Sequence, residues 1–403
     1  MTREYWFRSS SIKLEEVTST SMDDVLSDKD DVVNGNNTAY YKNGKKLEND
    51  DEEKEFTEED FKSEVLQVVK GIINRNFDHI ILLSGAGTSV VDDGSLGKTM
   101  KVLWNTIVEE LKKDDTLFSL EELGTKTNFE FEYNENREIT SDLETFLSHL
   151  QVFENFNRDP KYTNTFKKIL NVIKDNVSYD YDSSKVNHPK IIELLSKRIN
   201  EPNKLMVVTT NYDILFESAA EDLNYTVIDG FSFSATPFFN TSNFDWNLIK
   251  HIPNVKTKEL EYKPNVIDIL KIHGSITWEK EEDKIYRKPK DSVIRPIMIF
   301  PTQDKYSQSY DEPYFELFSK FQEALKRNNT LLITSGFSFS DKHITRMIEQ
   351  SIKNNNGLSM LVTDMNITDN KNNGWEKVIN LMNNELQVAF LKAKFSELDD
   401  YLR

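Results

Sequence analysis

The chain has 403 residues, of which 37% are apolar and 11% aromatic, which is enough to bury a sizeable core. Its 50 Lys and Arg residues against 68 Asp and Glu give a formal charge of −18, which repels nucleic-acid phosphates in the absence of an evident basic cluster. The sequence has no cysteine, which excludes disulfides, thiolate metal sites and cysteine nucleophiles, and it has no signal-peptide pattern or apolar run of membrane-spanning length. We therefore expect a cytoplasmic protein that contacts neither nucleic acid nor membrane directly.

The N-terminal region is acidic. Residues 23–60 hold 14 acidic and 5 basic side chains, a composition that cannot bury enough apolar surface to fold alone. Before this stretch, Tyr5-Trp6-Phe7 and Ile12-Lys13-Leu14 predict a short strand that docks on the body of the protein or on a neighbouring subunit. We expect residues 1–56 to form an N-terminal arm followed by an acidic loop or linker.

A regular pattern begins at Thr57, where Thr57-Glu58-Glu59-Asp60 resembles a capping box. The helix that follows is predicted to end near Phe77. The next apolar run, His79–Ser84, is closed by Gly85-Ala86-Gly87, a pattern typical of a buried parallel strand that turns into a helix. One face of the first helix carries its apolar side chains, namely Phe61, Val65, Val68, Val69, Ile72 and Ile73.

The rest of the chain predicts an α/β fold. Residues 100–200 have helical periodicity and indicate a helical module inserted at about 96–200, whereas residues 235–265 have no period that we can assign. Alternating strands and helices favour a doubly wound parallel sheet of the Rossmann-like type over residues 57–403. Strands are predicted at Leu205–Thr209, Tyr225–Ile228, Ile269–Ile272, Pro296–Phe300, Thr330–Thr334 and Ser359–Val362, with one or two last elements near Leu386–Leu391.

Four strand ends carry small and polar residues. The first is Gly85-Ala86-Gly87-Thr88-Ser89, where glycines let a phosphate approach the backbone and a helix N-terminus attracts its charge. A Gly-rich turn can also serve packing alone. The Rossmann spacing is not met, because Val90 stands where a third glycine is expected, and a Walker lysine is absent.

The second strand end is Thr209-Thr210-Asn211-Tyr212-Asp213, at the sheet edge where open α/β folds bind ligands. Asn211 is suited to hold a ribose hydroxyl and a water, and its alternative role is an Asx turn that satisfies its own backbone. For Asp213 the simpler role is to cap the helix that follows.

The third and fourth strand ends repeat the pattern. His273 lies at the carboxyl end of a strand, before Gly274 and Ser275, a place that favours catalysis although a lone histidine is more often a surface or core residue. Gly336 and Ser338 follow the strand Thr330–Thr334 and are suited to face a ribose or phosphate, the alternative being a simple turn with Asp341 as N-cap. Four such ends favour one shared nucleotide over four independent packing turns.

Together these four stretches resemble the sirtuin family over residues 79–363. The resemblance implies that Gly85–Ser89 cradles the pyrophosphate of NAD, that Asn211 with Asp213 positions the nicotinamide ribose and a water, and that His273 is the base on a ribose hydroxyl. The remaining predicted NAD contacts are Thr210, Gly274, Ser275, Gly336 and Ser338.

Two departures from the family argue against protein deacylation. The cysteine ligands of the sirtuin zinc ribbon are absent, so we expect no zinc, and Val90–Ser95 replaces a Pro-Asp-Phe-Arg-like segment. Three further segments resemble a bacterial branch of NAD-depleting effectors of phage defence. They are Gly336–Ile344, Phe300-Pro301-Thr302, and Lys305-Tyr306 before Pro313-Tyr314. Some members of that branch work with a HerA-like hexameric ATPase.

The sequence therefore predicts a sirtuin-like NAD⁺ glycohydrolase that uses NAD as its substrate and releases nicotinamide and ADP-ribose. The resemblance further implies an effector of phage defence, a homo-oligomer and a HerA-like partner. Two alternatives stay open: an NAD-dependent protein deacylase or ADP-ribosyltransferase, and a non-catalytic subunit that binds NAD or ADP-ribose. A nuclease is more distant, since no cluster of metal-binding carboxylates is evident.

Overall fold

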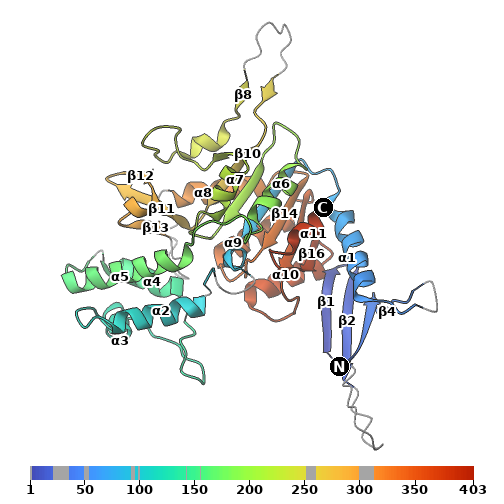
Figure 1. Cartoon of the computed structure of the whole chain (residues 1–403), viewed down its shortest axis with the longest axis horizontal. Coiled ribbons are helices and arrows are strands. Elements are labelled where there is room, and N and C mark those ends of the chain that lie inside the picture. Colours follow the sequence, from blue (N-terminus) through green and yellow to red (C-terminus); the bar gives the residue numbers. More distant parts are fainter. Residues whose placement is uncertain are drawn as a thin grey trace, which may run out of the picture. The chain divides into compact units, whose positions relative to one another are not determined.

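The computed structural model describes residues 2–20, 36–49, 54–91, 96–98, 100–141, 143–154, 156–250, 260–298 and 313–403. The chain divides into two units, each with its own network of internal contacts. We call residues 1–81 and 325–403 the terminal unit, and residues 82–324 the central unit. Figure 1 shows the elements in chain order by colour and label.

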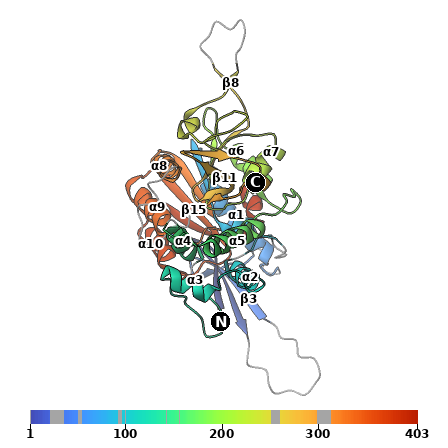
Figure 2. The same ribbon diagram turned by 90° about the vertical axis from the view of Figure 1, so that its left-hand side faces the viewer.

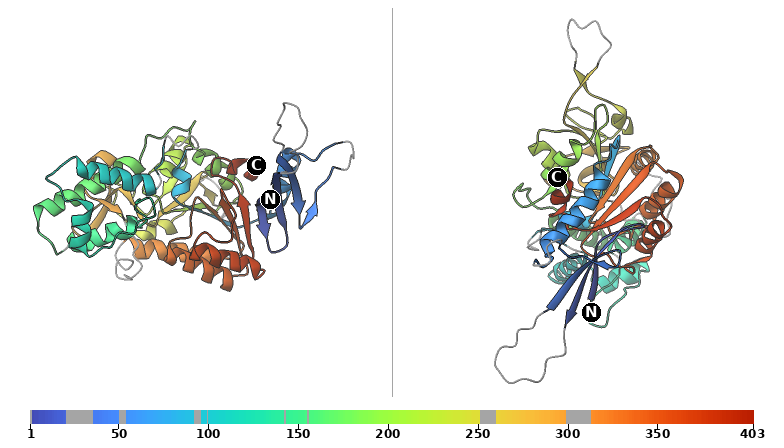
Figure 3. Two further views of the ribbon diagram at one scale, coloured as in Figure 1. Left: turned by 90° about the horizontal axis from the view of Figure 1, so that it is seen from below. Right: turned by 90° about the vertical axis from the view of Figure 1, so that its right-hand side faces the viewer.

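Three parallel strands form the centre of the terminal unit, with β15 between β14 and β16. Every residue of β14 is buried, as expected for a strand covered on both faces. Helix α9 packs with α10 on one face, and α1 packs with α11 on the other (Figure 3). These strands and helices are β14 (Thr330–Ser335), β15 (Leu358–Asp364), β16 (Val388–Lys392), α1 (Glu58–Ile73), α9 (Lys342–Asn354), α10 (Asn373–Asn383) and α11 (Leu398–Leu402).

An antiparallel extension joins β16 through β1 and continues in the order β2, β3, β4. The predicted N-terminal strand therefore docks on the chain's own sheet. The acidic loop or linker predicted within residues 1–56 is wrong for the part that forms β3 and β4, while residues 21–35 and 50–53 lie outside the described residues. The four strands are β1 (Thr2–Ser9), β2 (Lys13–Thr20), β3 (Asn36–Lys42) and β4 (Lys45–Lys46).

Long-range contacts explain why these polar strands escaped the sequence prediction. Tyr40 of β3 stacks on Phe61 of α1 with ring centroids 4.6 Å apart, and Trp6 of β1 meets the same ring edge-on at 5.5 Å. Buried Glu15 of β2 pairs with Arg3 of β1 at 3.3 Å. The strands are thus held by a few aromatic anchors and cross-strand charges, which leave no apolar period in the sequence.

The central unit contains three further parallel strands in the order β6, β10, β7. β5 contains the boundary between the units, and its last residue, Ser84, accepts a hydrogen bond from the amide of Thr210 at 3.0 Å. Helices α6 and α7 pack on each other beside β6. These elements are β5 (His79–Ser84), β6 (Leu205–Thr209), β7 (Thr226–Ile228), β10 (Val266–Lys271), α6 (His188–Ser196) and α7 (Leu215–Asp222).

The predicted helical region forms a packed module of four helices, followed by α6 (Figure 2). Its core contains Trp104, Phe146 and Tyr162, and extends to side chains outside the helices. Tyr212 and Ile214, which lie on either side of Asp213 in the turn after β6, pack against this core. The four helices are α2 (Met100–Lys112), α3 (Leu120–Thr127), α4 (Leu143–Glu154) and α5 (Pro160–Val177).

Small antiparallel sheets complete the central unit. We predicted Pro296–Phe300 as a strand of the parallel sheet, but β13 (Pro296–Met298) pairs antiparallel with β11 (Gly274–Glu281), and residues 299–300 lie outside the described residues. A three-residue strand can pair with either kind of neighbour, so its apolar character did not reveal the sheet. The other elements are β12 (Lys284–Arg287), β8 (Ile249–Lys250), β9 (Glu261–Tyr262), α8 (Tyr314–Leu325) and the 3₁₀ turns Ala86–Ser89, Thr241–Asp245 and Lys290–Ser292.

The predicted α/β class is confirmed, with parallel strands flanked by helices and a helical module between β5 and β6. In the part of the chain that the structure describes, no helix combines the length and the apolarity that a bilayer crossing requires.

Candidate functional site

The loop after β5 is a single 3₁₀ turn, Ala86–Ser89, and not the start of a long helix. Among the described residues the next α-helix is α2, which begins at Met100, so our expectation that a long helix begins at this loop is wrong. The reason is that Val90 continues in an extended conformation. Gly85, Thr88 and Ser89 are buried, whereas Ala86 and Gly87 are exposed. The backbone of these two small residues is the part of the loop that a ligand can reach.

The side chain of Asn211 holds this loop from the neighbouring strand end. Its Nδ2 lies 3.0 Å from the Gly85 carbonyl oxygen, 3.1 Å from Thr88 Oγ1 and 2.8 Å from Ser89 Oγ. The side chain is buried, where each such hydrogen bond is costly to lose. Asn211 therefore makes long-range contacts rather than the Asx turn that we considered as its alternative role.

Asp213 links the same loop to helix α7. Its Oδ2 accepts a hydrogen bond from Ser89 Oγ at 2.6 Å, and its Oδ1 accepts one from the amide of Leu215, the first residue of α7, at 3.1 Å. The N-cap of α7 is Ile214 and not Asp213, so the predicted capping role is wrong, although Asp213 accepts a hydrogen bond from the first helical amide. The other carboxylate oxygen couples the loop to the helix.

Two residues that the sequence analysis missed also contact Ser89. Tyr179 donates its hydroxyl hydrogen to the Ser89 carbonyl oxygen at 2.9 Å. Burial raises the pKa of Tyr179, and the Asp213 carboxylate raises it further, so the phenol stays protonated as a donor. Gly97 has a φ of +76°, and a Cβ placed there would lie 2.0 Å from the Ser89 carbonyl oxygen. Only glycine fits that close approach.

His273 lies in a tight turn between β10 and β11 and is buried, with 2% of its surface exposed. The turn depends on Gly274, which has a φ of +89° and whose added Cβ would lie 2.2 Å from the Ile297 carbonyl oxygen. A buried imidazole in a backbone-defined turn is held in one place. That rigidity is what a base needs in order to meet one particular hydroxyl.

Main-chain hydrogen bonds hold the His273 segment against the Asn211 segment. The amide of Ile272 donates to the Thr209 carbonyl oxygen at 3.0 Å, and the amide of Ile276 donates to that of Tyr212 at 3.1 Å. Ser275 is buried, and its Oγ lies 3.4 Å from the same Tyr212 oxygen. The structure therefore brings together three of the four predicted strand ends, 85–89, 209–213 and 271–276, all within the central unit.

The fourth strand end belongs to the terminal unit. The hydroxyl of Ser338 is exposed and donates to Ser340 Oγ at 3.1 Å, a local turn contact. The Oγ of Ser335, just before Gly336, is buried and has no hydrogen-bond partner among the described residues. Gly336 and Ser338 stay a prediction as NAD contacts.

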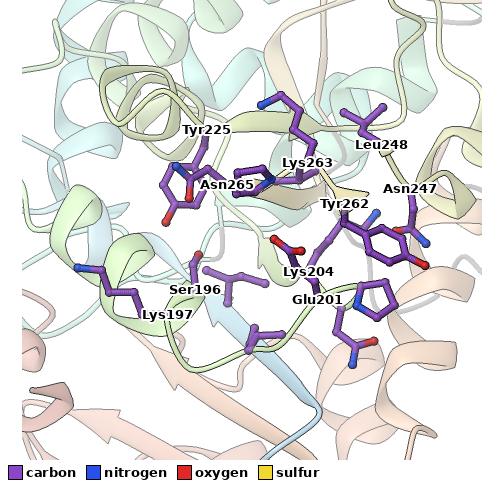
Figure 4. A pocket seen from close by; sticks show the side chains of 16 residues that line it. Ser196, Lys197, Glu201, Lys204, Tyr225, Asn247, Leu248, Tyr262, Lys263 and Asn265 are labelled. Atoms are coloured by element: carbon purple, nitrogen blue, oxygen red, sulfur yellow. The ribbon is translucent and has the colours of Figure 1, made fainter. Parts of the chain in front are cut away.

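A pocket of about 150 Å³ opens at the amino ends of β6 and β10 in the central unit. Figure 4 shows Lys204, Tyr225 and Tyr262 among the side chains around it. Lys204 is already paired with the buried Asp268 of β10 at 2.8 Å. Since Asn211 and His273 follow the other ends of the same strands, this pocket is separate from the candidate site.

Part of the chain is similar to a known domain family. None of the curated proteins matches the chain. Two solved structures, one described as the structural basis for sirtuin substrate affinity and the other as Sir2 with a p53 peptide and NAD⁺, are each 12% identical, with 83% of this chain and 95% of that chain covered and a TM-score of 0.35. At that score neither bears on function. Residues 205–381, which contain Asn211, Asp213 and His273 but not the 85–89 loop, match the family model of the SIR2-like domain.

Proposed function

We propose that the protein is an NAD⁺ glycohydrolase that cleaves the bond between nicotinamide and ribose and releases nicotinamide and ADP-ribose. The observation that carries the proposal is the network in which Asn211 and Asp213 hold the loop 85–89 beside the turn of His273. The match of residues 205–381 to the SIR2-like domain supports NAD as the substrate.

The loop is suited to the pyrophosphate of NAD. Its buried residues are anchored by Asn211 and Asp213, and its exposed tip consists of Ala86 and Gly87. Small side chains at the tip let phosphate oxygens approach backbone amides, which are good donors to anions. Anchoring lowers the cost of binding, because the loop does not have to be ordered when the substrate arrives.

Hydrolysis passes through an oxocarbenium-like state, so the site has to fix the ribose and one water. We assign His273 to accept a proton from a ribose hydroxyl and Asn211 to orient the ribose and the attacking water. The Nδ2 of Asn211 is engaged by the loop, so its Oδ1 is the atom that would accept a hydrogen from that water. Nicotinamide leaves as its bond to the anomeric carbon breaks and water bonds there; one proton of that water passes to solvent, and His273 returns its proton to the ribose oxygen as ADP-ribose forms.

The test measures, by chromatography, how much nicotinamide the purified protein releases from NAD. We expect His273→Ala and Asn211→Ala to abolish release while circular dichroism and thermal unfolding show a folded protein. If both variants cleave NAD at the wild-type rate, the assignment is overturned. ADP-ribose retained on a protein or an acylated product would instead favour transfer or deacylation. Binding of NAD without turnover would favour the non-catalytic alternative.

We further propose that the activity serves as an NAD-depleting effector in phage defence and is gated by homo-oligomer assembly or by a HerA-like ATPase. Unregulated NAD cleavage would kill the host, so a gate is required. The test repeats the nicotinamide assay with and without a HerA-like ATPase, at several protein concentrations. A rate that depends on neither partner nor concentration would remove the gate from the proposal.

A further inference from the structure

A buried lysine lies directly behind the candidate site, and the roles assigned so far do not use it. Lys271 is the last residue of β10, two positions before His273, and only 1% of its surface is exposed. A lysine this deeply buried is rare unless its charge is compensated. Its surroundings therefore have to supply both a counter-charge and hydrogen-bond acceptors.

Two groups meet the Lys271 ammonium. Nζ pairs with Glu217 Oε1 of α7 at 3.1 Å, and it also donates a hydrogen bond to the carbonyl oxygen of Asp213. Burial raises the pKa of Glu217, and the Lys271 charge opposes that rise. The other carboxylate oxygen, Oε2, is buried and has no hydrogen-bond partner among the residues that the structure describes. The carboxylate thus depends on Lys271 for its compensation.

The Asp213 contact gives the lysine a place in the site. The Asp213 side chain holds Ser89, and Asn211, two residues earlier, holds the rest of the loop. Lys271 therefore ties the main chain of the Asn211–Asp213 turn to the strand that carries His273. Main-chain hydrogen bonds already link the two segments at Thr209 and Tyr212, and Lys271 adds a charged donor beyond them, at the residue that contacts the loop.

We infer that Lys271, paired with Glu217, is a positioning residue that sets the Asn211–Asp213 turn and the 85–89 loop relative to His273. The inference rests on the proposed NAD hydrolysis for its kinetic effect. Its structural content concerns only how firmly the turn and the loop are held.

The same strand offers a matched control. At its amino end, Asp268 pairs with Lys204 at 2.8 Å, with 8% and 13% of the two side chains exposed. Lys204→Met with Asp268→Asn removes a buried lysine–carboxylate pair from β10, as Lys271→Met with Glu217→Gln does, but far from the turn. Neutralising both partners in each case avoids leaving a lone buried charge.

The experiment compares the two double variants by steady-state kinetics and by hydrogen exchange read by mass spectrometry. For Lys271→Met/Glu217→Gln we expect a fall in kcat of about 100-fold with KM within about threefold, since misplacement by about 1 Å has that effect on rate. We also expect faster exchange in peptides covering 82–91 and 209–216. Lys204→Met/Asp268→Asn should keep the wild-type kcat and the wild-type exchange in those peptides.

Three outcomes would overturn the inference. A wild-type kcat in Lys271→Met/Glu217→Gln would do so, and so would an equal loss in both double variants, which would indicate a general effect on folding. If the wild-type protein releases no nicotinamide, the proposed function fails and the exchange data decide alone. Unchanged exchange at 82–91 and 209–216 would then refute the positioning role.

Discussion

The chain leaves β6 and β14 through turns of similar composition, each with small polar residues and an aspartate before the next helix. After β14, the aspartate Asp341 accepts hydrogen bonds from the amides of His343 and Ile344, Ser338 contacts Ser340, and the Ser338 carbonyl oxygen accepts a hydrogen bond from the side chain of Asn372, 34 positions away. After β6, Asp213 and Asn211 contact a loop more than 120 positions away in the sequence. The difference teaches that the same local pattern can close a turn or assemble a site, depending on where the side-chain oxygens and nitrogens find partners.

The largest expected effect comes from breaking the long-range turn. Asn211→Ala removes the donor shared by Gly85, Thr88 and Ser89, and we expect nicotinamide release to fall by at least about 100-fold, as when a preorganised donor is lost from an active site. Asn355→Ala is the control, because that buried asparagine donates to the carbonyl oxygens of Leu325 and Arg327 in the terminal unit and contacts neither turn in the described part of the chain. An equal loss of activity in the control would erase the contrast between the two turns.

The two aspartates give the sharpest comparison of stability. Asp341→Ala should lower the free energy of unfolding by about 1 kcal/mol, the usual effect of a lost cap. Asp213→Ala loses the hydrogen bond from the amide of Leu215 and also the charged hydrogen bond with Ser89, both buried, so we expect about 3 kcal/mol. Urea unfolding measures both values.

Ser89→Ala completes the aspartate comparison as a double-mutant cycle with Asp213→Ala. If the Ser89–Asp213 bond provides the excess, the two substitutions together should cost less than the sum of their separate effects. Strict additivity would show that the excess arises elsewhere.

Acid should weaken the region after β6 through His188 of α6. The ring lies 4.5 Å from that of Phe216 in α7, and burial lowers the pKa of His188 to about 3. The unfolded chain takes up this proton below about pH 6.5, but the folded chain does so only near pH 3. This group therefore contributes a loss of about 1.4 kcal/mol for each pH unit as pH falls between those values.

Unfolding of wild type and His188→Leu in urea at half-unit pH steps measures that slope. The carboxylates titrate in both proteins, so the difference between the two slopes belongs to His188. Parallel curves between pH 6 and pH 4 would contradict a buried neutral imidazole.

The smallest effect on stability is expected at the turn after β14. Ser338→Ala removes an exposed hydroxyl that contacts Ser340, and exposed substitutions of this kind usually change stability by less than about 0.5 kcal/mol. Thermal unfolding should stay close to wild type, and an unchanged rate in the nicotinamide assay would remove Ser338 from the predicted NAD contacts. A large loss of activity would assign Ser338 to the ligand, as the resemblance to sirtuins implies, and would make the two turns alike in function.

The sequence predicted those parts of the fold that local patterns determine. β5 and β6 lie at their predicted bounds, because apolar runs buried on both faces end at polar residues. The strands β3, β11 and β12 were missed and only the start of β2 was indicated, since each has polar side chains that are accommodated by neighbouring strands. The helix expected at the 85–89 loop was wrong for a similar reason, because side chains from a distant turn determine the shape of that loop.

For the site, the sequence indicated Asn211, Asp213 and His273, but not how they are held. Tyr179 and Lys271 owe their places to contacts with Ser89 and Asp213, which only the folded chain brings near. A signal was present for Lys271: a charged residue ends an otherwise apolar run just before His273. No comparable signal marks Tyr179.

The turn after β6 alternates between two environments, one residue at a time. Asn211 and Asp213 turn toward the loop at 85–89, while Tyr212 and Ile214 pack against the core of helices α2 to α5. This short segment thus connects the 85–89 loop of the candidate site to the helical module. A ligand that displaces the loop would also displace the side chains packed against the helices. Conversely, a subunit that shifts the helices would change the position of the loop. Deleting the helical module would therefore expose the apolar side chains of Tyr212 and Ile214 to water, and the neighbouring Asn211 and Asp213 would be held less firmly.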